Sequence, residues 1–170
     1  MQVLEKEDEL IELVPRRGSR PAIRREPHVQ AEQFPPSGMA DRIGGRILRL
    51  PHVQERESQI ADRAVRAFWI PDEFASTGAK AFICSHEFCH LHPAPGTTLH
   101  MVLPEPVARQ AAELGWCEPH PLANMGFLPR GLSVVYAPRT DGEFEIVMSL
   151  VEAAYRFATG SKNGNRGKGN

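Results

Sequence analysis

The sequence predicts an α+β fold: a single domain with an antiparallel sheet of about four or five strands and helices packed on one face. A chain of 170 residues suits one hydrophobic core. Its extended runs are joined by a hairpin connection at residues 93–96, and amphipathic helices follow the strands. No GxGxxG motif, P-loop or internal repeat occurs, which argues against a nucleotide-binding α/β fold.

The N-terminal segment 1–36 is predicted to be an extended arm rich in proline and arginine. Five prolines in this segment fix φ and remove N–H donors. A weak apolar pattern in residues 1–13 favours a short helix before them. Residues 37–160 form the predicted domain body, and the tail 161–170 is expected to be disordered because it has no apolar side chain.

Within the body, strands and helices are distinguished by their apolar period. Alternating or β-branched segments predict strands at 63–70, 79–92, 97–103 and 132–137. Apolar faces at helical spacing predict helices at 37–50, at 104–114 and from 141 onward. Ser37 and the Thr140–Glu143 capping box are the expected helix starts, and Gly115 is the expected left-handed stop of the second helix.

Charge and cysteine content restrict the class of protein. Twenty basic and 21 acidic residues leave a net charge of -1, so we expect no nucleic-acid partner. No apolar run approaches the roughly 18 residues of a membrane span, so no membrane partner is expected. Three cysteines without framework spacing indicate a reducing compartment, and we predict a cytoplasmic protein that acts on a small molecule. The oligomeric state stays open.

Histidines are the residues that concentrate chemistry in this chain. Five of the seven lie between residues 84 and 120. Strand alternation predicts that Cys84, His86, Phe88, His90 and His92 share one face. One register of the hairpin then brings His90, His92 and His100 to a common point, as expected for a polar pocket or a metal site.

Further candidates follow in the sequence. His120 lies on a loop after Gly115 that can return over the same face. Arg139 ends the last predicted strand, where its guanidinium can bind an anionic group or pair with Glu143. Trp116 is a core residue or a substrate-stacking one.

Four motifs are distinctive in combination: EFCHLH (87–92), TLHMVL (98–103), GWCEPHPLA (115–123) and VYAPR (135–139). They resemble the luciferases of luminous fungi, a family that also includes many bacterial proteins labelled only as luciferase domains. The resemblance implies oxidation of a hydroxypyrone, 3-hydroxyhispidin, by O2 without an organic cofactor. Carried over by motif, the matching positions are His90, His92, His100, His120, Tyr136 and Arg139, with Glu87 as a weaker match. We predict a catalytic role for His90, His92, His100, His120 and Arg139, and a substrate-binding role for Trp116, Tyr136 and Glu87.

Three functions remain open from the sequence. The first is O2-dependent oxidation of an enolic or phenolic small molecule, with a histidine as general base and light emission not assumed. The second is a metal-dependent hydrolase or oxygenase with a divalent ion on His90, His92 and His100. The third is a non-catalytic domain that binds a small molecule. Whether the protein is an enzyme is thus not decided, with an oxidoreductase favoured.

Overall fold

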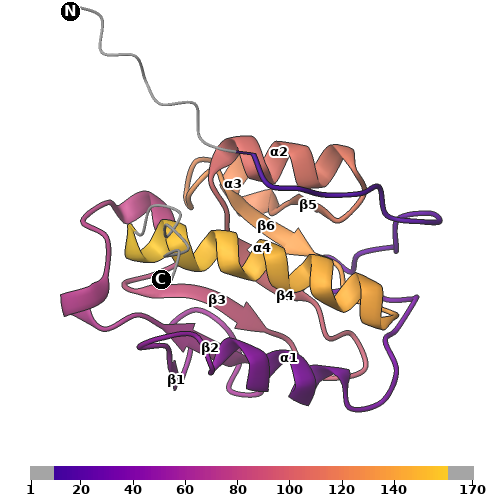
Figure 1. The fold of residues 1–170 in the computed structure, drawn as a ribbon, viewed down its shortest axis with the longest axis horizontal. Helices are drawn as coiled ribbons and strands as arrows, with labels where there is room; N and C mark the ends of the chain where they lie inside the picture. Colours follow the sequence, from indigo (N-terminus) through magenta and orange to yellow (C-terminus); the bar gives the residue numbers. More distant parts are fainter. Residues whose placement is uncertain (1–9, 161–170) are drawn as a thin grey trace, which may run out of the picture.

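The computed structural model describes residues 10–160, and it has one six-stranded sheet (Figure 1). All strand pairs are antiparallel, in the order β1-β2-β3-β4-β6-β5. The strands are β1 (Gln54–Arg56), β2 (Arg66–Trp69), β3 (Glu87–Leu91), β4 (Leu99–Val102), β5 (Cys117–Pro119) and β6 (Leu132–Val135). The helices are α1 (Met39–Ile47), α2 (Glu105–Glu113), α3 (Pro121–Asn124) and α4 (Asp141–Thr159), with 3-10 turns η1 (Asp72–Phe74) and η2 (Ala79–Ala81).

The two faces of the sheet are covered differently. The main core joins buried side chains of α1, α2 and α4 to one sheet face, which is why the long helices lie on the same side (Figure 1). A smaller apolar cluster on the opposite face consists of Ile83, Val102, Ala123 and Leu132. The predicted α+β class with helices on one face is therefore confirmed for the three long helices, whereas the four-residue α3 joins the smaller cluster.

Helix ends test the local predictions. Thr140 caps α4 as expected, since its side chain accepts a hydrogen bond from the Glu143 N–H. Gly115 has φ 87°, the left-handed conformation expected after α2. Ser37 was expected to cap α1, and this is wrong: Gly38 occupies the cap with φ 84° and no side-chain hydrogen bond. Glycine adopts this left-handed conformation with little strain, so the chain turns without a polar cap.

The predicted long strand at 79–92 is also wrong in its first half. Residues 79–81 form η2, and Cys84 and Glu87 bridge a tight turn, so only Glu87–Leu91 is strand. Ser85 takes φ 50° within that turn. The short strands β1 and β5 and the helix α3 were not predicted, because three or four residues are too few to show a period.

The described part of the arm, residues 10–36, crosses the body and is hydrogen-bonded to it. Arg16 donates its backbone N–H to the Leu114 carbonyl at 2.8 Å, and the Trp116 indole donates to the Val14 carbonyl at 2.7 Å. The buried Gln30 accepts from the Ala137 N–H at 2.7 Å. Residues 10–13 form no helix, and the rest of the helix expected in 1–13 lies outside the described residues, as does the tail 161–170.

Candidate functional site

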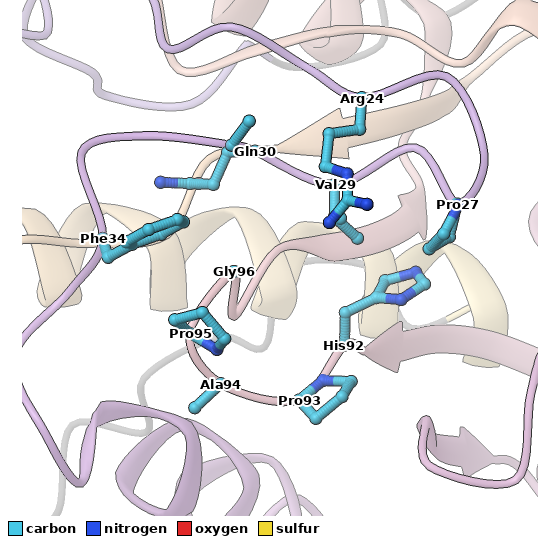
Figure 2. A pocket seen from close by; sticks show the side chains of 11 residues that line it. Arg24, Pro27, Val29, Gln30, Phe34, His92, Pro93, Ala94, Pro95 and Gly96 are labelled. Atoms are coloured by element: carbon cyan, nitrogen blue, oxygen red, sulfur yellow. The ribbon is translucent and has the colours of Figure 1, made fainter.

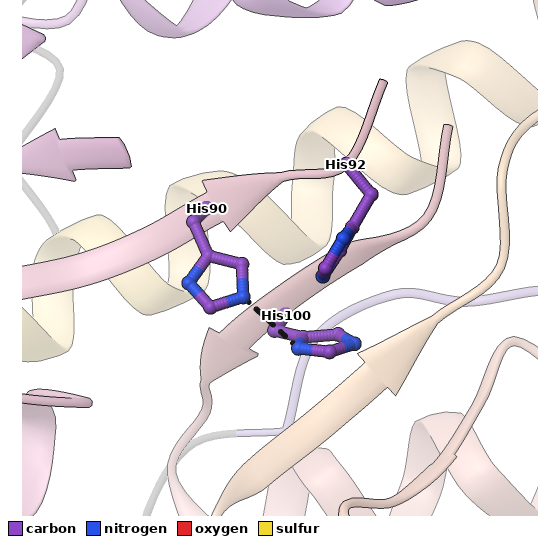
Figure 3. Close-up of side chains that lie close together, drawn as sticks. All are labelled: His90, His92 and His100. Carbon is purple, nitrogen blue, oxygen red and sulfur yellow. Dashed lines mark hydrogen bonds between the residues drawn. The ribbon is translucent and has the colours of Figure 1, made fainter. Parts of the chain in front are cut away.

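Two neighbouring strands bring three imidazoles together on the face opposite the long helices. His90 on β3 lies directly across from His100 on β4, and His92 follows the end of β3. Their rings point toward one another (Figure 3), and His90 Nε2 lies 3.0 Å from His100 Nδ1. One nitrogen of each ring lies within 4.8 Å of the others. The predicted convergence of His90, His92 and His100 is confirmed, and we call these residues the histidine cluster.

A bulge in β3 decides which carboxylate reaches the histidine cluster. Phe68 pairs with Cys89, whereas the next residue, Trp69, pairs with Glu87, so Phe88 is the extra residue. The bulge interrupts the alternation, and Phe88 packs in the main core against Tyr155. Glu87 therefore lies beside His90. The predicted shared face of Phe88 and His90 is wrong for this reason.

The outer nitrogens of two rings are held by fixed acceptors. His90 Nδ1 lies 2.7 Å from the buried Glu87 carboxylate, and the Ser58 hydroxyl lies 3.1 Å from both oxygens of that carboxylate. His100 Nε2 donates to the His28 backbone carbonyl at 2.6 Å. An acceptor on the outer nitrogen fixes the ring orientation and directs the other nitrogen inward.

His92 differs from its two neighbours. Its residue is only 5% exposed, and within residues 10–160 its Nε2 has no hydrogen-bond partner. Buried polar nitrogens are normally bonded, so an orphaned one next to two other imidazoles calls for an explanation.

A cavity of about 400 Å³ opens onto the cluster. Its polar lining includes His28, His120 and the three clustered histidines. Its apolar lining comes from several separate segments: Ile60, Val65, Ile83, Leu122, Leu128 and Leu132. A mostly apolar wall with a few convergent polar groups is the usual form of a small-molecule site.

A second cavity, of about 470 Å³, lies between the arm and the 93–96 turn (Figure 2). Arg24, Gln30 and Phe34 of the arm face Pro95 and Gly96 across it. Of the histidine cluster it contains only His92, so we assign the chemistry to the smaller cavity.

Burial controls the charge state of the imidazoles. Burial lowers the pKa of His92 to about 3, and repulsion from His90, His120 and His28 adds to this effect. Burial also lowers the pKa of His100 well below its usual value, and that of His120 to about 4. These rings are therefore neutral near pH 7, the state in which imidazole accepts a proton or binds a metal ion.

His120 and His28 complete the polar wall of the cavity. The His120 ring lies 4.9 Å from the His100 ring and 4.7 Å from the His28 ring, both edge-on. His120 Nδ1 accepts the Leu122 N–H at 3.2 Å and so caps α3. With Nδ1 as acceptor, a neutral ring carries its proton on Nε2. Sequence reasoning missed His28, because a lone histidine beside proline, 72 residues from His100, gives no spacing signal.

The other predicted site residues lie outside this cavity. Arg139 pairs with Glu143 at 2.5 Å and donates to the Arg17 carbonyl, so it steadies the start of α4 and the arm. Trp116 is buried, and its indole N–H donates to the Val14 carbonyl of the arm. Tyr136 donates its hydroxyl to the Glu118 carboxylate at 2.9 Å. His86, expected on the histidine face, instead pairs with Asp72 in a loop.

Comparison with known proteins finds a similarity over part of this domain. Residues 85–154 match the family model described as Luciferase domain. This segment, which contains the histidine cluster, His120 and Arg139, is thus similar to the luciferase-domain family over less than half of the chain. No helix within residues 10–160 is long and apolar enough to cross a membrane.

Three fungal relatives illustrate the similarity. The chain is 31% identical to the luciferases of Armillaria gallica and Armillaria mellea, and 32% identical to that of Neonothopanus nambi, each over 80 residues. The aligned region covers 46% of this chain and 30% of each relative, so the chain spans less than a third of the length of these luciferases. No solved structure matches the chain at a significant level.

Proposed function

We propose that this protein oxidises an enolic or phenolic small molecule, such as a hydroxypyrone, with O2 as the co-substrate. The observation that carries the proposal is the group of buried, neutral imidazoles at one wall of an apolar cavity of about 400 Å³. The similarity to luciferases supports an oxidation, since luciferases as a class oxidise a small molecule with O2. Light emission is not part of the proposal.

The chemistry begins with loss of the substrate's enol or phenol proton to an imidazole lone pair of the histidine cluster. The resulting anion is electron-rich at carbon and reduces O2, so that a carbon–oxygen bond forms and gives a peroxide anion. The imidazolium returns its proton to this anion, which yields the substrate hydroperoxide and restores the neutral imidazole. The His120 Nε2–H, free to donate because Nδ1 is the acceptor, would stabilise the substrate oxyanion. The apolar walls would bind the carbon skeleton and exclude water.

Three features make His120 the residue for the first test: it lines the cavity, its Nδ1 is engaged and it lies outside the three-histidine group. We expect His120→Gln to keep the fold and slow O2 uptake by roughly 10²–10³-fold with a panel of hydroxypyrones and phenols. His52→Gln is the matched control, because His52 stacks on Phe74 and does not line the cavity. No O2 uptake by the unmodified protein with any member of the panel would refute the proposal.

The same experiment separates a catalytic domain from one that only binds. A non-catalytic small-molecule domain would bind members of the panel without consuming O2. The unpartnered His92 nitrogen favours catalysis, because a binding site alone gains nothing from a buried orphaned base. The free thiols of Cys84, Cys89 and Cys117 support a reducing compartment, such as the cytoplasm, as the place of action.

A further inference from the structure

The inward nitrogens of the histidine cluster form a set of lone pairs with a shared focus. His90 Nε2 and His100 Nδ1 lie 3.0 Å apart, and one nitrogen of each cluster ring lies within 4.8 Å of the others. The three rings come from one hairpin: His90 lies on β3, His92 directly after its end, and His100 at the facing position of β4. A rigid two-strand scaffold is suited to a fixed ligand geometry, because neither strand can shift without breaking the sheet.

The outer hydrogen bonds identify which nitrogens carry protons. His100 donates from Nε2 to the His28 carbonyl, so in a neutral ring Nδ1 has the lone pair. His90 Nδ1 faces the Glu87 carboxylate, an acceptor, which leaves Nε2 facing inward. Carboxylate and carbonyl acceptors on the outer nitrogens are the usual supports of metal-binding histidines.

A proton alone does not satisfy this arrangement. Shared between His90 and His100, it pairs two of the three inward nitrogens. His92 Nε2 would remain without a partner among the described residues, although His92 is only 5% exposed. A cation bound to all three rings satisfies every inward nitrogen at once.

We propose that His90, His92 and His100 bind one divalent first-row transition-metal ion, with its remaining coordination positions directed into the cavity. Imidazole ligands suit zinc, iron, cobalt, nickel and copper, whereas calcium and magnesium require oxygen ligands. Glu87 is a supporting residue and not a ligand, since its carboxylate is engaged by His90 and Ser58. His120 lies outside the three-residue group and is not a ligand in this proposal.

The proposal concerns the same cluster as the oxidation but does not depend on it. A bound cation would occupy the lone pairs of the histidine cluster, so it would replace the free imidazole as the group that favours ionisation of an enol; such a cation equally suits hydrolysis. Metal binding is therefore measured directly and without substrate, so that failure of the oxidation and failure of the metal site are separate results.

The test uses purified protein freed of metal with a chelator and titrated with Zn²⁺ and with Co²⁺. We expect one ion per chain by calorimetry, a visible absorption band with Co²⁺, and a thermal midpoint that rises with metal concentration. His92→Gln keeps the side-chain length but lacks the imidazole ligand, and we expect its affinity to fall at least about 100-fold. His120→Gln is the matched control, a cavity histidine whose replacement should leave the affinity unchanged.

Circular dichroism verifies the fold of each variant. Should His92→Gln not fold, Glu87→Gln provides the second test: loss of the carboxylate behind His90 should weaken binding by about 10–100-fold. No stoichiometric binding by the unmodified protein would overturn the proposal. Equal affinity of His92→Gln and the unmodified protein would also overturn it.

Discussion

The two faces of the β3–β4 hairpin are buried to nearly the same degree but have opposite chemistry. Toward the helices, Leu91 pairs with Leu99 and Cys89 with Met101, all at most 1% exposed. On the other face His90 pairs with His100, at 3% and 5% exposure. Burial of apolar side chains stabilises the fold, whereas burial of polar rings costs free energy unless they are bonded. The helix face thus contributes stability through apolar burial, whereas the histidine face carries a desolvation cost that hydrogen bonds offset only in part.

The largest expected effect comes from breaking the helix face. Leu99→Ala removes a fully buried side chain from the main core, and we expect the free energy of unfolding to fall by about 2–5 kcal/mol. Urea denaturation followed by circular dichroism measures it. A loss below 1 kcal/mol would mean that apolar burial on the helix face does not stabilise the fold as expected.

An apolar substitution on the histidine face should raise the free energy of unfolding instead of lowering it. His92→Leu replaces an unpartnered nitrogen with an apolar side chain, so the free energy of unfolding should rise by about 1 kcal/mol in the presence of chelator. The same variant should lose O2 uptake and metal binding, because it lacks the imidazole. A variant less stable than the unmodified protein would show that the Nε2 atom has a partner in solution.

The ion pair between Arg139 and Glu143 lies on neither face of the hairpin, and it provides a comparison in which charge stabilises the fold. Burial raises the pKa of Glu143, but hydrogen bonds from the Arg139 side chain and backbone, together with the Arg139 charge, outweigh it and lower the pKa overall. The stabilising contribution is therefore complete above the ordinary glutamate pKa of about 4.3 and disappears as the pH falls through the lower folded value. At pH 7 Glu143→Gln should cost about 1 kcal/mol, a figure reduced by the partial exposure of Arg139.

Denaturation curves at a series of pH values check this prediction. The unmodified protein and Glu143→Gln should converge in stability below pH 4, because a protonated glutamate no longer pairs with Arg139. A difference that persists at pH 2 would mean that the ion pair is not the source of the effect.

The smallest expected effect is that of Arg139 on turnover. Because its guanidinium bonds Glu143 and the Arg17 carbonyl, Arg139→Lys should leave O2 uptake unchanged while lowering stability slightly. Steady-state uptake and a thermal melt on the same sample measure both quantities. A large loss of turnover would place Arg139 in the reaction, as the resemblance to fungal luciferases implies.

Features that depend on local chemistry could be predicted from the sequence. The Thr140 cap, the left-handed Gly115 and the apolar stripe of α4 are each specified within a few residues. The pairing of His90 with His100 follows from a short hairpin connection, so the histidine cluster was also within reach of the sequence. Each of these interactions joins residues at most ten positions apart, where spacing alone restricts the geometry.

The groups that surround the histidine cluster could not be predicted from the sequence, because they come from segments that meet only in the folded protein. The bulge at Phe88 depends on the pairing of β3 with β2, and it puts Glu87 beside His90. The His28 carbonyl reaches His100 because the arm crosses the sheet, although 72 residues separate the two in sequence. Arg139 bonds Glu143 and the arm, although its position in the sequence equally allowed a place in the cavity. Such contacts depend on how distant segments pack, and neither local propensity nor residue spacing contains that information.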